Sequence, residues 1–69
     1  MNVQEAKHNE QKAADKLTTA RGRLPALALD PVKNAAQLQA VQAEIEKLTE
    51  ELRLAKIATF QAQIAELEA

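Results

Sequence analysis

The chain has 69 residues, a net charge of −1 from nine basic and ten acidic side chains, and no cysteine. So short a chain forms one domain at most, with a small core that often needs oligomerisation for stability. Lack of cysteine excludes disulfides and thiolate metal sites. Balanced charge offers no strong field for nucleic acid or an anionic membrane.

The sequence contains no apolar run long enough to cross a bilayer and no apolar signal-peptide region at its N-terminus. We therefore expect a cytoplasmic protein. Because the chain begins with Met, we also expect a small, complete gene product.

Alanine dominates the apolar residues, with 15 of the 69 positions. The large apolar types Leu, Ile, Val and Phe supply only 16 of 69 residues, just above the level typical of disorder. Ala, Glu, Lys, Leu and Arg together supply 41 of 69. These strong helix formers are typical of long helices and coiled coils, so the composition predicts an all-α fold.

The first predicted helix covers residues 3–22. Asn2 can cap its N-terminus, and Glu5 follows three residues later, as in a capping box. Gly22 and Pro25 are expected to end it. Alternating spacings of three and four residues predict a heptad seam, weak because most of its positions are Ala and one is Glu. The seam residues are Val3, Ala6, Glu10, Ala13, Leu17, Ala20 and Leu24.

Residues 23–30 are predicted to form a linker, which is unusually apolar for a loop. We interpret Leu27 and Leu29 as a plug that fills the open end of a helix pair. The alternative interpretation is an exposed tip that binds a partner.

The second predicted helix covers residues 31–68. Asp30 is the expected N-cap and Pro31 the first helical residue, and no later Gly or Pro interrupts the helix. The short connection favours an asymmetric antiparallel hairpin, with arms about 30 Å and about 55 Å long.

The second helix carries two apolar stripes. The first keeps heptad spacing, is expected to pack on the first helix, and consists of Leu38, Val41, Ile45, Leu48, Leu52 and Ala55. The heptad spacing of this first stripe is predicted to end at Thr59. The second stripe lies roughly 100° around the helix from the first. This second stripe consists of Ile57, Phe60, Ile64 and Leu67.

The first helix is expected to be too short to cover the second stripe. That stripe is therefore the predicted interface, either with a second copy of the chain or with another protein. Phe60 is the only aromatic residue, so we expect it to be the central contact.

Little in the sequence indicates catalysis or metal binding. Glu5 and His8 have the Glu-x-x-His spacing of di-iron bundles, but a solvated His near a chain end is the plainer interpretation. The chain has no Ser, and no nucleophile, acid and base can be assembled, so we expect neither an enzyme nor a cofactor. The acidic residues of the second helix are expected to form local pairs on a solvated face. These are Glu44–Lys47, Glu50–Arg53 and Lys47–Glu51.

The sequence also bears on RNA binding and on membrane binding. Basic residues near the bend and on the first helix allow RNA binding by a dimeric bundle, although no aromatic side chains are interleaved for base stacking. They are Lys12, Lys16, Arg21, Arg23 and Lys33. The tail of the second helix lacks the basic polar face that interfacial membrane helices usually have, so we expect no membrane binding.

Residues 23–69 combine Leu-Pro and Asp-Pro steps with the runs Glu-Ile-Glu-Lys-Leu-Thr-Glu-Glu-Leu and Gln-Ile-Ala-Glu-Leu-Glu. This pattern resembles the small Ala- and Leu-rich coiled-coil hairpin proteins of tailed phages and prophages. The resemblance implies a virion or assembly accessory and supplies no functional residue. The leading hypothesis is a non-enzymatic structural or assembly module that acts through helix–helix packing. A small regulatory binder or inhibitor, and an RNA-binding dimeric hairpin, are the alternatives.

Overall fold

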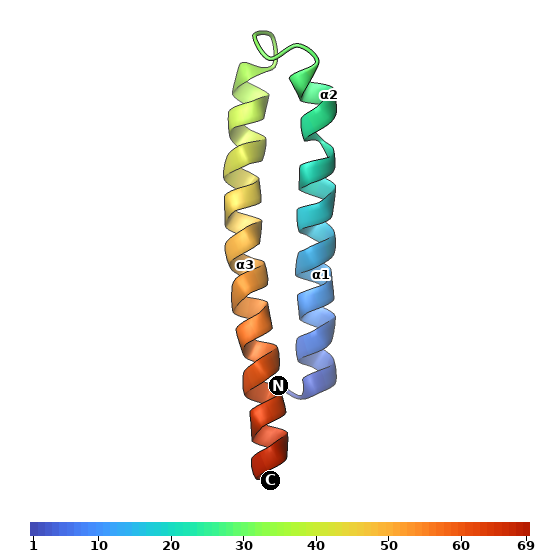
Figure 1. The fold of residues 1–69 in the computed structure, drawn as a ribbon, viewed down its shortest axis with the longest axis vertical. Coiled ribbons are helices and arrows are strands. Elements are labelled where there is room, and N and C mark those ends of the chain that lie inside the picture. The colour runs from blue at the N-terminus through green and yellow to red at the C-terminus, as the bar shows by residue number, and fades with distance from the viewer.

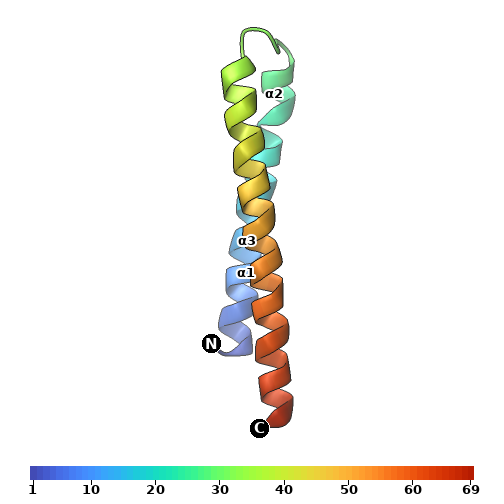
Figure 2. The ribbon, with the colours of Figure 1, turned by 90° about the vertical axis from the view of Figure 1, so that its left-hand side faces the viewer.

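The computed structural model describes residues 1–69 as an antiparallel helical hairpin (Figure 1). The first arm consists of α1 (Val3–Gly22) and the short α2 (Leu24–Ala28), and the second arm is α3 (Ala35–Glu68). The molecule is a rod of 56 × 14 × 12 Å. Seen from the side, its two arms cross at a shallow angle (Figure 2). The predicted all-α hairpin is confirmed.

The N-terminus of α1 is capped as predicted. Asn2 has an extended backbone, and its Oδ1 accepts a hydrogen bond from the Glu5 amide at 2.8 Å. The Asn2 Nδ2 in turn donates to Glu5 Oε1 at 3.1 Å. This return bond differs from that of a capping box, in which the acidic side chain accepts from the backbone N–H of the cap residue.

The predicted end of the first helix at Gly22 is only a short interruption. Arg23 is a turn residue that keeps right-handed helical dihedrals, and its amide donates to the Ala20 carbonyl at 3.2 Å. Pro25 lies in the first turn of α2, where a missing N–H costs no intrahelical bond. The prediction of a linker over residues 23–30 is therefore wrong for residues 24–28, which continue the arm as helix.

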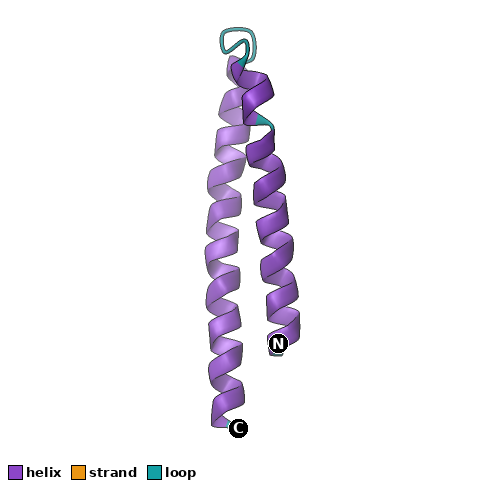
Figure 3. Ribbon diagram, turned by 45° about the vertical axis from the view of Figure 1, so that its right-hand side comes forward, coloured by secondary structure: helices purple, strands orange, loops and turns teal.

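The loop follows α2 and covers residues 29–34 (Figure 3). Asp30 does act as a cap, because its Oδ1 accepts from the Lys33 amide at 3.2 Å and its carbonyl from the Asn34 amide at 3.0 Å. The capped segment is a single turn, however, and α3 begins four residues later than the predicted start at Pro31. Asn34 breaks the helix there, with φ −99° and ψ 17°, and its side-chain amide donates to the Leu27 carbonyl at 3.1 Å.

The predicted heptad seam packs the two arms together. Leu17, Ala20 and Leu48 form the buried centre of the contact, and Ile45 and Leu52 pack against it. Every predicted seam residue is buried or half-buried. The buried ones are Ala6, Ala13, Leu17, Ala20, Val41 and Leu48, and the half-buried ones are Val3, Glu10, Leu24, Leu38, Ile45, Leu52 and Ala55.

The prediction that the seam fails at Thr59 is wrong. Thr59 is only 5% exposed and Ala62 only 9%, so the heptad register continues with smaller residues. The Thr59 hydroxyl donates to the Ala55 carbonyl at 3.1 Å, which satisfies the buried polar group within its own helix. Met1 reaches further still and lies beside Ala65. The first arm therefore covers most of α3, and only the last part of α3 projects past the N-terminus (Figure 1).

The predicted leucine plug is half right. Leu27 is half-buried and lies between the arms beside Val41. Leu29 is 87% exposed, so the prediction of its burial is wrong. The reason is the extra helix: α2 holds Leu27 on the inner side of the arm, whereas Leu29 follows the end of α2 and points out of the loop.

We predict that Leu48→Ala destabilises the hairpin by about 2–4 kcal/mol, because it removes a large side chain from the centre of a small core. Val32→Ala is the matched control, since Val32 is 88% exposed and should change stability by less than about 0.5 kcal/mol. Urea denaturation followed by circular dichroism measures both variants. Equal effects would contradict the placement of the core.

A second pair of variants tests the bend. Leu27→Ser should lower the melting temperature by several degrees, because it removes a half-buried apolar side chain. Leu29→Ser should leave the melting temperature nearly unchanged, because this side chain is already in water. A larger loss for Leu29→Ser than for Leu27→Ser would restore the original plug interpretation.

Candidate protein-interaction surface

The second apolar stripe of α3 is exposed to solvent. Ile57 is 38% exposed, Ile64 54%, Phe60 62% and Leu67 87%. No other part of the chain covers these side chains, as the sequence predicted. We refer to these four residues as the outer stripe.

The reason for this exposure differs from the predicted one. The first arm is long enough to reach the outer stripe, since it buries Thr59 and Ala62 on the same turns of α3. The stripe is exposed because it faces away from that arm. If Leu52 and Ala55 are heptad positions a and d, the four stripe residues fall at positions b and f, on the outside of the pair.

One exposed residue extends the stripe and was missed by the sequence analysis. Leu54 is 52% exposed and lies at heptad position c, one turn before Ile57. Its spacing of three residues from Ile57 was the available signal. Together with the stripe it makes a run of large apolar side chains along the last four turns of α3.

The outer stripe is free of charged neighbours over most of its length. Residues 57–65 contain no acidic or basic side chain. Lys56 precedes the first stripe residue, and Glu66 and Glu68 lie on either side of the last one, Leu67. The stripe is thus bounded by a positive charge at one end and a negative charge at the other.

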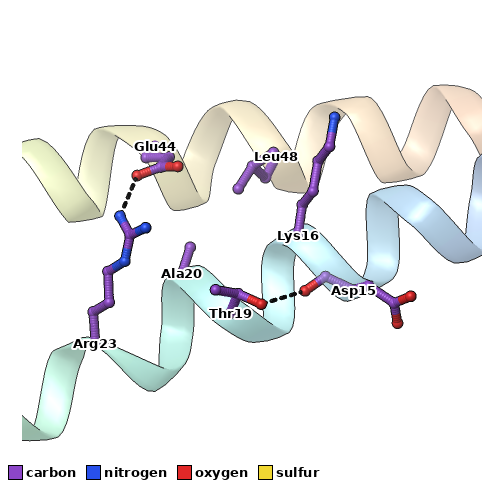
Figure 4. Close-up of a pocket in the computed structure, with 7 residues that line it drawn as sticks. All are labelled: Asp15, Lys16, Thr19, Ala20, Arg23, Glu44 and Leu48. Atoms are coloured by element: carbon purple, nitrogen blue, oxygen red, sulfur yellow. Dashed lines mark hydrogen bonds and ion pairs between the residues drawn. The ribbon is translucent and has the colours of Figure 1, made fainter.

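Between the arms lies a shallow groove of about 300 Å³ (Figure 4). On one side of it, Arg23 Nη1 and Glu44 Oε2 form an ion pair at 3.3 Å across the two arms. Both side chains are about half exposed, so the pair contributes no more than about 1 kcal/mol. The remaining lining residues are Asp15, Lys16, Thr19, Ala20 and Leu48.

Of the three local ion pairs predicted for α3, the Glu50–Arg53 pair is present. Arg53 Nε donates to Glu50 Oε2 at 2.9 Å. This bond holds the pKa of the Glu50 carboxyl below its ordinary value and raises the pKa of Arg53. The lowered carboxyl pKa means that the pair stabilises the fold at neutral pH and that this small effect is lost on acidification. Glu44 pairs with Arg23 rather than with the predicted Lys47.

The Glu-x-x-His spacing does not build a site in the chain. Glu5 and His8 are both exposed, and the Glu5 carboxylate accepts from Asn2. Nowhere in the chain do three or more His, Cys, Asp or Glu side chains gather as a metal ion would require.

Two further exposed apolar side chains lie at the bend. Leu29 and Val32 are 87% and 88% exposed. They are isolated in the loop and do not continue a helical stripe. None of the helices combines the length and the apolar character needed to span a bilayer.

Comparison with known protein families, with curated proteins and with solved structures found no match.

Glu10 is the one charged residue in the seam, and it is half-buried. It lies in a shallow depression between the arms, beside Leu52 and Lys56. Arg53 bonds to Glu50 and not to Glu10.

We predict that Glu10→Leu raises the free energy of unfolding by about 0.5–1 kcal/mol, because the new side chain can pack on Leu52 without desolvating a carboxylate. Glu5→Leu changes an exposed position on the same helix and serves as a control. It should destabilise slightly through loss of the capping contact. A loss of more than about 1 kcal/mol for Glu10→Leu would indicate a specific partner for that carboxylate.

Proposed function

We propose that this protein is a non-enzymatic interaction module that assembles with a protein partner through the outer stripe of α3. The observation that carries the proposal is the exposure of the stripe on a helix whose inner seam is already occupied by its own first arm. A helix with two apolar faces can pack on two partners at once. The hairpin provides only one of them.

The distribution of large side chains supports this proposal. The buried core contains only three large apolar residues, Leu17, Val41 and Leu48. The C-terminal half of α3 exposes five, which are Leu54 and the four members of the outer stripe. Such contiguous apolar surface is typical of interaction sites on small proteins.

The surface chemistry also favours a protein partner over RNA. The outer stripe has no basic residue among positions 57–65, so it cannot follow a phosphate backbone. Arg23, a basic residue at the bend, is engaged by Glu44 across the groove. No aromatic side chain lies near it to stack on a base, because Phe60 is the only aromatic residue and lies on the outer stripe.

A structural or assembly role fits this surface, in line with the resemblance to hairpin proteins of tailed phages and prophages. A virion or assembly complex would supply a helical partner for the stripe. The second candidate is a regulatory binder, which would dock the same stripe on one target protein. Both use the same helix–helix contact.

Photo-crosslinking in the cells that produce the protein tests the proposal. p-Benzoylphenylalanine at position 60 replaces the aromatic residue of the stripe with a reactive aromatic. The matched control carries the same group at position 46, which is Glu46, two heptads earlier on the same face. We expect protein adducts at position 60 and few at position 46.

Equal yields at both positions, or no protein adduct at position 60, would contradict the proposal. Adducts with RNA at position 60 would favour the RNA-binding alternative instead.

A further inference from the structure

We propose that Pro31 and Asn34 together form a lock that keeps the chain folded back on itself as a hairpin. Without this lock, the chain becomes one straight helix and pairs antiparallel with a second copy through the same inner seam. Such a pair is a domain swap, in which the first arm of each copy packs on α3 of the other. The inference concerns the inner seam and does not depend on what binds the outer stripe.

The seam keeps one unbroken heptad register through the bend. Alternating steps of three and four residues lead along the sequence from Leu24 to Leu27, then to positions 31 and 34, and then to Leu38. A loop does not transmit helical phase, so a hairpin does not require the two arms to match in this way. A straight helix requires it. The two register positions inside the loop hold Pro31 and Asn34, and neither residue suits a helix seam.

Pro31 prevents the straight helix. In a continuous helix, the amide of residue 31 donates to the carbonyl of Leu27, four residues earlier. Proline has no amide hydrogen, its ring clashes with that carbonyl, and it disfavours helical dihedrals in Asp30 before it. In agreement with this, α2 ends at Ala28 and Asp30 is a bend residue.

Asn34 occupies the acceptor that Pro31 leaves free. Its Nδ2 donates to the Leu27 carbonyl at 3.1 Å, in a partly buried hydrogen bond that joins the end of α2 to the residue before α3. In a straight helix, residues 27 and 34 lie about 10 Å apart along the axis, so this bond exists only in the hairpin. Pro31 therefore disfavours the straight form, and Asn34 stabilises the bent one.

The rest of the loop adds little to hold the bend closed. Leu29 and Val32 are exposed, so neither side chain packs on the arms. No residue of the chain has a positive φ, and Leu29 keeps right-handed helical dihedrals, with φ −62° and ψ −31°. The Asn34 amide donates to the Asp30 carbonyl at 3.0 Å with the four-residue spacing of a helix. Once the lock is removed, few backbone dihedrals have to change for the loop to become helical.

The seam itself does not select one form over the other. Leu17 and Ala20 pack on Leu48 in the hairpin, and they make the same contacts with Leu48 of the second copy in the swapped pair. The bend alone therefore decides between the two forms. They differ in length, because a straight helix over residues 3–68 is about 100 Å long, whereas the hairpin extends 56 Å.

Distances within one chain separate the two forms. Lys16 and Glu44 line the same groove between the arms (Figure 4), where helix axes lie about 10 Å apart. In a straight helix they lie about 40 Å apart along the axis. Lys16→Cys and Glu44→Cys allow both positions to carry nitroxide labels, because the natural chain has no cysteine. Labelled chains diluted into an excess of unlabelled chains report only the distance within one chain, by double electron–electron resonance.

The natural bend should give the short distance at every concentration. Pro31→Leu combined with Asn34→Leu should give the long one, with a rise in helix content by circular dichroism. Sedimentation equilibrium should show dimerisation at least about 100-fold stronger, the fold-change that corresponds to the cost of about 3 kcal/mol for a proline inside a helix. Asn34→Leu alone should keep the short distance, because Pro31 still blocks the straight helix.

Two control variants share these chemical changes but leave the lock intact. Val32→Leu combined with Lys33→Leu adds apolar side chains to the same loop outside the heptad register. Pro25→Ala removes the other proline, which lies in the first turn of α2 and does not block a helix there. Both controls should keep the short distance and the dimerisation of the natural chain.

Three results would each overturn the inference. The first is a long distance in the natural chain, because the lock then does not hold. The second is a short distance in the variant with Pro31→Leu and Asn34→Leu, whether that variant is a monomer or a dimer of intact hairpins. The third is a long distance in either control, because added apolar surface or loss of any proline would then suffice to open the bend.

Discussion

Contact between the two arms, along a seam of mostly small residues on α1 and mostly large ones on α3, is the interaction on which this structure depends. The buried centre of the seam is small: Leu17, Ala20 and Leu48, with Ile45 and Leu52 packed against them. Alanine fills most of the remaining positions on α1, which lets the helix backbones approach closely but buries little apolar surface per turn. The rod has no second layer that could compensate, so the stability of the chain is set by this one line of contacts and by its connection at the bend.

Heptad spacing was sufficient to predict the helix pair, and the short connection was sufficient to predict its antiparallel orientation. Each seam position on α1 is at least half-buried, including the Glu at position 10, because an apolar line of that period can face only one direction on a helix. The details of the bend could not be predicted in the same way. Pro25 indicates a helix end or a helix start equally well, and only tertiary packing of Leu27 decides between them. The bond from the Asn34 side chain to the Leu27 carbonyl joins residues seven positions apart and leaves no periodic signal in the sequence.

The exposure of the four outer-stripe residues was predicted correctly, but its cause was predicted incorrectly. The apolar pattern indicated that the seam ends before Thr59, because the next heptad positions hold Thr59, Ala62 and Glu66. Whether a residue is buried depends on the direction in which its side chain points from the helix as well as on its size. The Thr59 hydroxyl can be buried because it donates a hydrogen bond to a carbonyl of its own helix. The heptad positions that face away from the partner helix were the reliable signal for exposed residues. Leu54, at position c, is one of them.

The seam changes in strength along the rod, and this has a consequence for dynamics. Leucine, isoleucine and valine hold the half near the bend, whereas Ala6, Thr59 and Ala62 hold the open half. Smaller side chains give fewer contacts per turn, so amide hydrogens at the start of α1 should exchange faster than those near Leu48. The outer stripe occupies this same loosely held half. Any helix that docks there would steady the turns that fray most readily and slow their exchange, so that binding and local folding become a single coupled equilibrium.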